Sequence, residues 1–541
     1  MLTRKPYLIG SFCFLLLLVA FQFFSMNMGF EGDHFTHRYD QARADALMPV
    51  DVPPQAPTYY LVGREDDPAF LCARWMLARL KLPYSTADQL DAQAYASAPQ
   101  TLLLAADMAA LGEENALRAY LRAGGQVIFL RLPDDLPKAG ALLDDLGILS
   151  VGESITCEQM EIYEGLLLGG MVRYKELPFT GRRLRLNSLC KVWACMWEGD
   201  PNRRTLEVPL LYEKRVGEGI VHVANGPFFE DASGIGLLTG LLAIPREAFL
   251  YPVVNAMTVS LVNFPLLTAD SPAIRDVYAR NAYQVCRDVF WPDLASALRE
   301  NRLTATAFVP DMAAEGRAGE LAFFLRALSD HHGEIGLTAP MTGLPEIAER
   351  YPDYGLFAAL GEAVNESIRC VVRPLSIQDA GFSLDGSVLY PLLTQGHAFD
   401  EAENLRLRGF ASGLYLIHHG VDMSLPLLLA EPDHAWQQMS RDLASTLNDS
   451  MAPYPAMRRR NASAASVDML AYGRIQPAIE GSQAGLSIQS GLAAETCFLL
   501  RTKREIASAQ GLAYTRVEKG VYLLTLSGSS ASLTWKEASA P

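Results

Sequence analysis

The chain has 541 residues, of which 50% are hydrophobic and 20% are charged, and its formal net charge is -15. This length and hydrophobic content predict two to four globular domains with large cores and exclude a disordered chain. The acidic balance also excludes nucleic acid as a partner, because binding to phosphates requires a basic face.

The first segment, residues 1–30, has the pattern of a membrane anchor. Arg4 and Lys5 precede an apolar run from residue 7 to about residue 28, close to the roughly 20 residues that a helix needs to cross a bilayer. The positive-inside rule places the N-terminus in the cytoplasm and the rest of the chain outside the cell membrane. A cleaved signal peptide is the alternative, but the run is long and no A-x-A site follows it.

Residues 31–57 form a polar, proline-containing linker, which we expect to separate the folded body from the membrane. From residue 58 to 250, short apolar runs such as 100–106 and 126–132 alternate with amphipathic stretches. This alternation predicts a parallel sheet covered by helices, in a flavodoxin-like or amidotransferase-like doubly wound domain. The segment lacks a glycine-rich phosphate loop and a Cys-His-Glu arrangement, so we expect a structural or recognition role.

Residues 251–474 continue the alternation of strand-like and helix-like segments. This order predicts a (β/α) barrel, whose functional groups lie at the C-terminal ends of its strands. In residues 475–541 apolar and polar residues alternate with period two, which predicts a small antiparallel C-terminal β unit. The fold class is therefore α/β, with an N-terminal transmembrane helix.

Three predicted strand ends carry polar residues that could act together. The first ends at Ala269 and Asp270, the second is the stretch "HHGEIGLTAPMT" at 331–342, and the third is "LYLIHHGVDM" at 414–423. This arrangement resembles the NodB-type polysaccharide deacetylases. In that family an aspartate base and an aspartate metal ligand end the first strand, two histidines in "EIG-x-H-x3-H" complete the metal site, and a late Leu-x-x-His supplies the acid.

The sequence matches the scaffold of this family more closely than its reaction centre. Asp270 matches the metal aspartate, but the base position is Ala269, and the two histidine positions are Thr338 and Thr342. The position of the acid matches His418 or His419, so these two are the candidate catalytic residues. A single carboxylate, where the family has three metal ligands, binds a divalent ion only weakly, so we expect no bound metal. Asp270 is the candidate metal ligand. Zinc would be the cofactor only if displaced ligands restored an active enzyme.

Two adjacent histidines, His331 and His332, are the alternative source of such ligands. On a strand, their side chains point to opposite faces, so at most one reaches the site. As a helix C-terminus followed by a glycine cap, the pair is ordinary. The pattern favours the cap.

Several further residues have both a functional and a structural interpretation. His397 lies in the polar stretch 385–409, which lines a sugar-binding cleft or forms a solvated loop and helix face. Trp291 either stacks on a sugar ring or belongs to the core. The basic triplet 458–460 meets an anionic partner or forms a charged turn. The predicted binding residues are Asp270, Glu334, Thr338, Thr342, His397 and Trp291.

The eight cysteines show no zinc-ribbon spacing. Cys190 and Cys195 are near enough in sequence to form a disulfide in an oxidising compartment. Two separate buried thiols are the alternative.

The whole chain resembles the bacterial domain-of-unknown-function family 2194. That family consists of membrane-anchored, deacetylase-like proteins associated with exopolysaccharide gene clusters, including Pel-like ones. The stretches that carry the resemblance are "LLLGGMVRY", "GEGIVHVANGPFFEDASGIGLL", "YPVVNAMTVSLVNFPLL", "RDVFWPDLASAL" and "CFLLRTKREI". They extend almost to the C-terminus.

These observations predict a single-pass membrane protein of exopolysaccharide assembly or export. We expect a degenerate, non-catalytic deacetylase-like protein that binds a glycan or serves as a scaffold. The expected partners are an extracellular polysaccharide, membrane-embedded synthase or export subunits, and the lipid bilayer. The alternatives are an active metal-dependent deacetylase or hydrolase with displaced ligands and a purely structural partner of a synthase complex.

Overall fold

The computed structural model describes most of the chain beyond residue 38. The described residues are 39–90, 95, 101–136, 140–198, 206–265, 272–310, 318–338, 356–362, 367–379, 382–384, 386–427 and 436–536. The predicted membrane anchor therefore lies outside them. Within these ranges, no helix is both long and apolar enough to cross a membrane.

The first layer of the molecule is a mixed nine-stranded sheet. Its parallel half consists of β1 (Tyr59–Gly63), β2 (Tyr84–Ala87), β3 (Thr101–Ala105), β4 (Gln126–Phe129) and β11 (Gly219–Ala224). They lie in the order β2-β1-β3-β4-β11, which is the 2-1-3-4-5 order of flavodoxin-like sheets. The accompanying helices are α3 (Pro68–Arg79), η1 (Met108–Leu111), α5 (Glu114–Arg122), α6 (Ala141–Leu146), η2 (Ala232–Gly234) and α7 (Ile235–Ala243).

The other half of this sheet is antiparallel. It continues from β11 through β10 (Leu206–Val216), β9 (Lys191–Glu198), β6 (Gln159–Ile162) and β7 (Val172–Tyr174). A separate ribbon pairs β5 (Ile148–Cys157) with β8 (Phe179–Leu186). The segment also contains Cys190 and Cys195, which are separate thiols, as are the other described cysteines.

The second layer is a parallel sheet that nearly closes into a barrel, so the α/β class and the barrel expected from the sequence are confirmed. Its strands are β13 (Ala256–Val262), β14 (Ala305–Val309), β15 (Glu334–Thr338), β16 (Ala358–Leu360), β17 (Cys370–Pro374), β19 (Ser387–Leu392), β20 (Thr394–Gln395) and β21 (Leu416–Asp422). A short β18 (Ser383–Leu384) pairs antiparallel with β19.

The barrel closes through one continuous segment of chain. The first part of this segment, β19, pairs with β17, and its last part, β20, pairs with β21. Between them, Leu393 N donates to the carbonyl of His418 at 3.1 Å. Because β21 also pairs with β13, the segment joins the two ends of the sheet.

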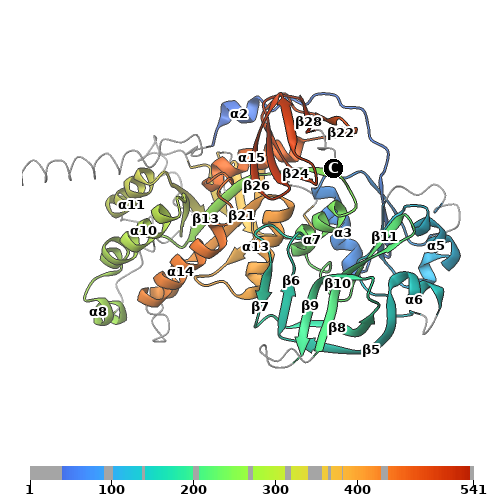
Figure 1. Cartoon of the computed structure of the whole chain (residues 1–541). Coiled ribbons are helices and arrows are strands. Elements are labelled where there is room, and N and C mark those ends of the chain that lie inside the picture. The colour runs from blue at the N-terminus through green and yellow to red at the C-terminus, as the bar shows by residue number, and fades with distance from the viewer. Residues whose placement is uncertain are drawn as a thin grey trace, which may run out of the picture.

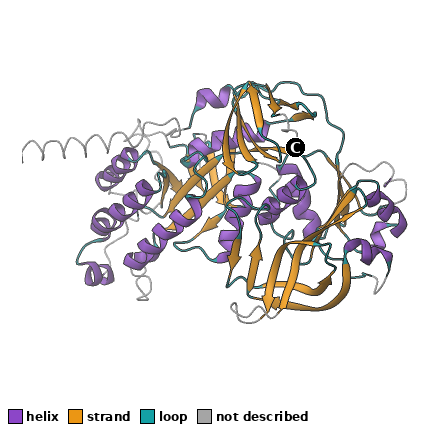
Figure 2. Ribbon diagram, viewed as in Figure 1, coloured by secondary structure: helices purple, strands orange, loops and turns teal. Residues whose placement is uncertain are grey.

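Helices surround the barrel strands (Figures 1 and 2). They are α8 (Pro272–Tyr278), α9 (Ala282–Val285), η3 (Cys286–Phe290), α10 (Trp291–Glu300), α11 (Ala318–Asp330), α13 (Glu401–Gly413), η5 (Leu425–Leu427), α14 (Trp436–Met451) and α15 (Ala462–Arg474). Helix α13 begins at a capping box in which Asp400 accepts from Glu403 N and the Glu403 side chain accepts from Asp400 N. Helix α15 packs against β13, β17 and β19.

Two four-stranded antiparallel sheets form the C-terminal part, and they lie beside α2 (Gln41–Asp45) in Figure 1. Their strands are β22 (Ala478–Gly481), β23 (Gly485–Gln489), β24 (Thr496–Thr502), β25 (Ile506–Gln510), β26 (Leu512–Glu518), β27 (Val521–Leu526) and β28 (Ser530–Trp535), together with β12 (Ala248–Val253). Strand β12 spans the predicted boundary at 250/251 and pairs with β24. A distant strand thus completes the C-terminal sheet.

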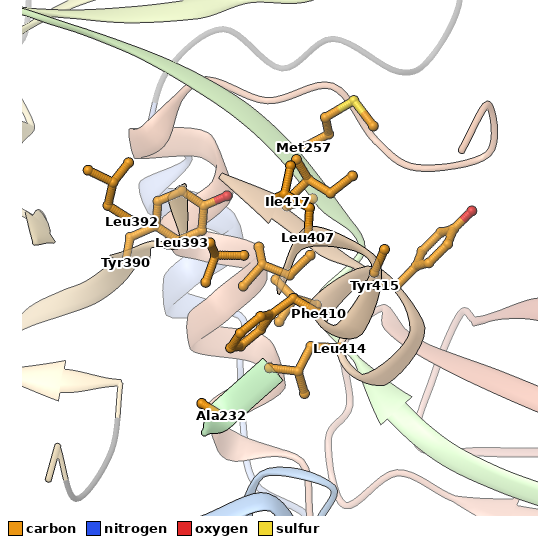
Figure 3. Packing of buried hydrophobic residues seen from close by; sticks show 14 of the residues in the cluster. Ala232, Met257, Tyr390, Leu392, Leu393, Leu407, Phe410, Leu414, Tyr415 and Ile417 are labelled. Carbon is orange, nitrogen blue, oxygen red and sulfur yellow. The ribbon is translucent and has the colours of Figure 1, made fainter. Parts of the chain in front are cut away.

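One hydrophobic core extends through the barrel and into the first layer. Figure 3 shows Leu407 and Phe410 of α13, and Leu414 just after this helix, gathered with barrel residues such as Ile417, close to Ala232 of η2. All of these side chains are buried. Helix α13 therefore fixes the barrel against the first sheet.

Candidate functional site

The predicted site lies at the C-terminal ends of the barrel strands, and part of it falls outside the described residues. Ala269, Asp270 and Thr342 belong to that part, so their surroundings are not described. The described rim includes the ends of β13, β15, β17, β20 and β21.

Thr338 and Glu334 lie at opposite ends of β15. Four residues of a strand span roughly 13 Å, so only Thr338 lies at the C-terminal rim. Its hydroxyl is buried and has no hydrogen-bond partner among the described residues. The structure therefore does not bring these two predicted binding residues together.

Glu334 instead binds the beginning of α15. Its Oε1 accepts from Thr306 Oγ1 at 2.8 Å and from Ser463 N at 2.9 Å. Thr306 Oγ1 in turn accepts from Ala462 N at 2.8 Å. Burial raises the pKa of Glu334, and the donors at the helix N-terminus lower it in part. These contacts satisfy helix N–H groups that would otherwise lack partners.

His418 points into the barrel from the middle of β21. Its Nδ1 lies 2.9 Å from the carbonyl oxygen of Pro391, and its Nε2 lies 2.7 Å from Ser260 Oγ. A carbonyl only accepts, so the proton is on Nδ1 and Nε2 accepts from the serine. Tyr390 stacks on the ring at 4.5 Å. Both nitrogens are thus used in the neutral form, and burial lowers the pKa of His418 to about 3.

His419 points to the opposite face, as alternation along a strand requires. Its Nε2 lies 2.8 Å from the carbonyl oxygen of Gly396, and its Nδ1 lies 2.9 Å from Thr394 Oγ1. The ring packs edge-on against Phe399 at 4.3 Å. Burial lowers the pKa of His419 to about 4. This imidazole is also neutral and fully hydrogen-bonded.

The carboxylate of Asp422, in the predicted polar strand end "LYLIHHGVDM", lies at the same rim. Asp422 ends β21 and is paired in register with Val262, the last residue of β13. Its Oδ1 accepts from Asn263 Nδ2 at 3.0 Å and from Ser424 N and Oγ at 2.9 and 2.7 Å. It faces the same side as His418, because the two are four residues apart on one strand. The sequence pattern places Asp422 in this polar strand end but assigns it no role of its own.

His331 and His332 follow the last residue of α11. His331 N and His332 N donate to Leu328 O and Ser329 O, which closes the helix. His332 itself takes the left-handed conformation, with φ of 59°, before Gly333. The pair thus lies at a helix C-terminus, and the left-handed position is His332 rather than the glycine.

Trp291 and His397 differ in their surroundings. Trp291 is only 7% exposed, packs parallel to Phe264 and contacts the His331 ring edge-on. The indole therefore belongs to the hydrophobic core. His397 is partly exposed between β20 and α13.

A cleft of about 530 Å³ opens where β17, β19 and β20 end, between α13 and the first layer. Three carboxylates line it, from Glu230, Asp231 and Glu403, with one guanidinium, from Arg406. Arg406 pairs with Asp231 at 3.5 Å. Burial raises the pKa of Glu403, which also caps α13. The remaining excess of negative charge favours a neutral or cationic ligand.

The deacetylase resemblance implies a zinc ion, and the described residues do not fit one. Structural and catalytic zinc sites use three or four side chains of histidine, cysteine or carboxylate type. Thr338 offers only a neutral hydroxyl, and both nitrogens of His418 are already hydrogen-bonded. In the described part of the chain, no three histidine, cysteine, aspartate or glutamate side chains gather where a metal ion could bind.

Comparison with known proteins gives similarities of fold only. No family model matches the sequence, and no curated protein sequence matches it. The chain is similar to Agd3, a carbohydrate deacetylase, at 10% identity and a TM-score of 0.49, over 89% of this chain and 99% of that chain. It is also similar to the exo-β-1,4-mannosidase Op5Man5 from an Opitutaceae bacterium, at 14% identity and a TM-score of 0.24, over 35% of this chain and 36% of that one. The GH42 β-galactosidase Gan42B is similar at 12% identity and a TM-score of 0.26, over 36% of this chain and 31% of that one.

Proposed function

We propose that this protein is a deacetylase-like carbohydrate-binding protein that does not hydrolyse its ligand. It belongs to family 2194 and acts outside the cell membrane in the assembly or export of an exopolysaccharide. The barrel supplies the scaffold, and the cleft beside α13 supplies the sugar-binding surface.

The state of His418 supports the non-catalytic role. A general acid must carry a proton at working pH and reach the leaving group. His418 carries its single proton on Nδ1, where Pro391 accepts it, and burial lowers its pKa to about 3. Its other nitrogen accepts from Ser260. The sequence adds that the base position is Ala269 and that threonines occupy both histidine positions.

The cleft beside α13 supports an uncharged or amino sugar as the ligand. Its carboxylates outnumber its guanidinium group, and carboxylates accept hydrogen bonds from hydroxyl and ammonium groups. Ser376, Gln378 and Gln395 add neutral donors and acceptors. A volume of about 530 Å³ lies within the usual range of small-ligand sites.

Release of acetate tests the non-catalytic role. Full-length protein is incubated with an N-acetylglucosamine tetramer, with added zinc or with chelator, and acetate is measured by NMR. We expect no release above the buffer in either condition. Zinc-dependent release that is lost in Asp270→Ala would establish the enzyme instead.

Binding to the same sugars tests the cleft. We expect the deacetylated glucosamine tetramer to bind, with roughly tenfold weaker binding for Glu230→Gln. Glu230 is exposed and has no side-chain partner among the described residues, so the change leaves the fold intact. Glu480→Gln, an exposed acid on β22, is the matched control. Equal affinity of both variants would exclude this cleft.

The membrane anchor is part of the proposal, and the apolar run in residues 1–30 supports it. A reporter fused after residue 30 should be active only outside the cell membrane. A cytoplasmic reporter would contradict this topology. Retention of a synthase subunit without any binding to sugar would favour the purely structural partner.

A further inference from the structure

A second cavity, of about 860 Å³, lies on the side of the molecule where α2 meets the C-terminal strands. Its walls come from α2, from the segment 455–460 and from strands β26 and β27. Four arginines line it, at positions 43, 458, 460 and 516, with one carboxylate from Glu495. This concentration of guanidinium groups stands out in a chain whose net charge is -15.

The extended backbone of the basic triplet 458–460 directs its side chains to two different sides. Arg458 O accepts from Met257 N, and Arg460 N donates to Met257 O, so the segment is extended beside β13. Alternation then sends Arg458 and Arg460 to one side and Arg459 to the other. Arg459 binds backbone carbonyls of its own loop, including Met457 O. Only the first and third arginines line the cavity.

A single buried carboxylate holds the arginines together beneath the cavity. Asp468 of α15 accepts from Arg43 Nη1 at 2.6 Å and from Arg460 Nε at 3.0 Å, and Arg458 Nη1 lies 3.5 Å away. Burial alone would raise the pKa of Asp468, but the three guanidinium groups lower it overall. Asp468 is therefore ionised and fixes the arginine side chains.

Three of the four arginines share two carboxylates, Asp468 and Glu495. Glu495 pairs with Arg458 at 2.6 Å and with Arg43 at 3.7 Å. Arg516, the fourth arginine of the cavity, donates from its Nε to the backbone carbonyl of Glu518 at 3.3 Å and is not paired with Asp468 or Glu495. Arginine presents its donors as a fork that matches carboxylates and phosphates.

We propose that this cavity binds the oxyanion of a charged sugar, a carboxylate or a phosphate, as a site independent of the cleft beside α13. Arg43 and Arg458 contact the oxyanion, and Glu495 competes with it for both. The hydroxyls of Thr515 and Thr525 and the apolar Leu523 line the rest of the cavity and contact the sugar body. The arginines alone carry the assignment of an oxyanion, whereas the choice of a sugar as its body rests on the proposed function.

The depth of the arginines favours a small group over a membrane surface. The side chains of Arg458 and Arg460 are 14% and 5% exposed. A flat lipid surface does not reach groups in such a recess, whereas a single sugar acid does. The cavity volume leaves space for a body of one or more sugar rings.

The test measures binding of defined probes to the full-length protein in a non-ionic detergent, by calorimetry. The probes are trigalacturonate, its uncharged methyl ester and glucose 1-phosphate. We expect one or both charged sugars to bind and the ester not to bind, and the tighter probe identifies the oxyanion. Equal binding of the ester would overturn the proposal. So would binding of short-chain dihexanoyl phosphatidylglycerol with no binding of either charged sugar.

Three variants separate a ligand site from a structural ion cluster. Arg458→Gln should bind the charged sugar roughly tenfold more weakly, and Asp468 keeps Arg43 and Arg460 as partners, so the fold persists. Glu495→Gln should bind about fivefold more tightly, because it removes the competing carboxylate. Arg441→Gln, on the exposed face of α14, is the control. Unchanged affinity in the first two variants, with circular dichroism showing intact folds, would overturn the proposal.

Discussion

His222 lies on β11 with neither ring nitrogen hydrogen-bonded among the described residues. It is completely buried, and burial lowers its pKa to about 3. The unfolded chain takes up a proton below about pH 6.5 and the folded chain does not, so His222 costs stability as the pH falls. At pH 5 this cost is about 2 kcal/mol.

Replacement of this histidine should therefore stabilise the protein. We expect His222→Leu to raise the free energy of unfolding, by about 2 kcal/mol more at pH 5 than at pH 8. Urea unfolding at both pH values measures the difference. An equal effect at both pH values would contradict this prediction, because it would mean that His222 takes up its proton in the folded chain as readily as in the unfolded chain.

At the residue scale, the sequence predicts which strands carry polar side chains. It predicts the roles of those side chains less well. The "EIGL" motif correctly locates a barrel strand. Glu334, however, is the first residue of this strand and lies at the end away from the C-terminal rim. The hydrogen bonds of His418 to Ser260 and Pro391 come from strands more than 25 residues away in sequence. No local pattern reports such partners, and the pattern around Asp422 likewise assigned that residue no role.

At the scale of elements, Glu334 connects a barrel strand to α15. Its Oε1 accepts from both Thr306 and Ser463 N. Glu334→Ala removes that acceptor and leaves a buried gap, so we expect a loss of about 2–4 kcal/mol in unfolding free energy. Glu334→Gln keeps an oxygen in place and should cost about 1 kcal/mol or less. Equal losses for both variants, measured in urea, would contradict the capping role.

The elements also show how far sequence pattern extends. Parallel strands of the first sheet and the barrel appear as short apolar runs, because both of their faces are buried, and β13 is an example. Strand β12 is a similar apolar run, but it pairs with β24. The paired residues, such as Pro252 and Phe498, are about 245 positions apart in the sequence. Pairing across that distance depends on the assembled core, and apolar runs do not specify it.

At the scale of the whole molecule, the three histidines that are buried in the described part of the chain contribute to the response to acid. His222, His418 and His419 have pKa values lowered by burial to about 3, 3 and 4. Above about pH 6.5 their burial has no proton-linked cost, and below that pH each lowers the free energy of unfolding by about 1.4 kcal/mol per pH unit, until the pH reaches its folded-state pKa. We expect acid unfolding to begin above pH 4, before most carboxylates titrate. Circular dichroism measures this, and constant stability between pH 7 and pH 5 would contradict it.

The most direct test of the non-catalytic role is the protonation state of His418 in the folded protein. NMR of the full-length protein with labelled histidines, with His418→Gln used for assignment, follows its ring nitrogens between pH 8 and pH 5. We predict a signal that does not titrate, with the proton on Nδ1 throughout. A titration midpoint near 6.5 would supply the missing general acid and contradict the proposed non-catalytic role.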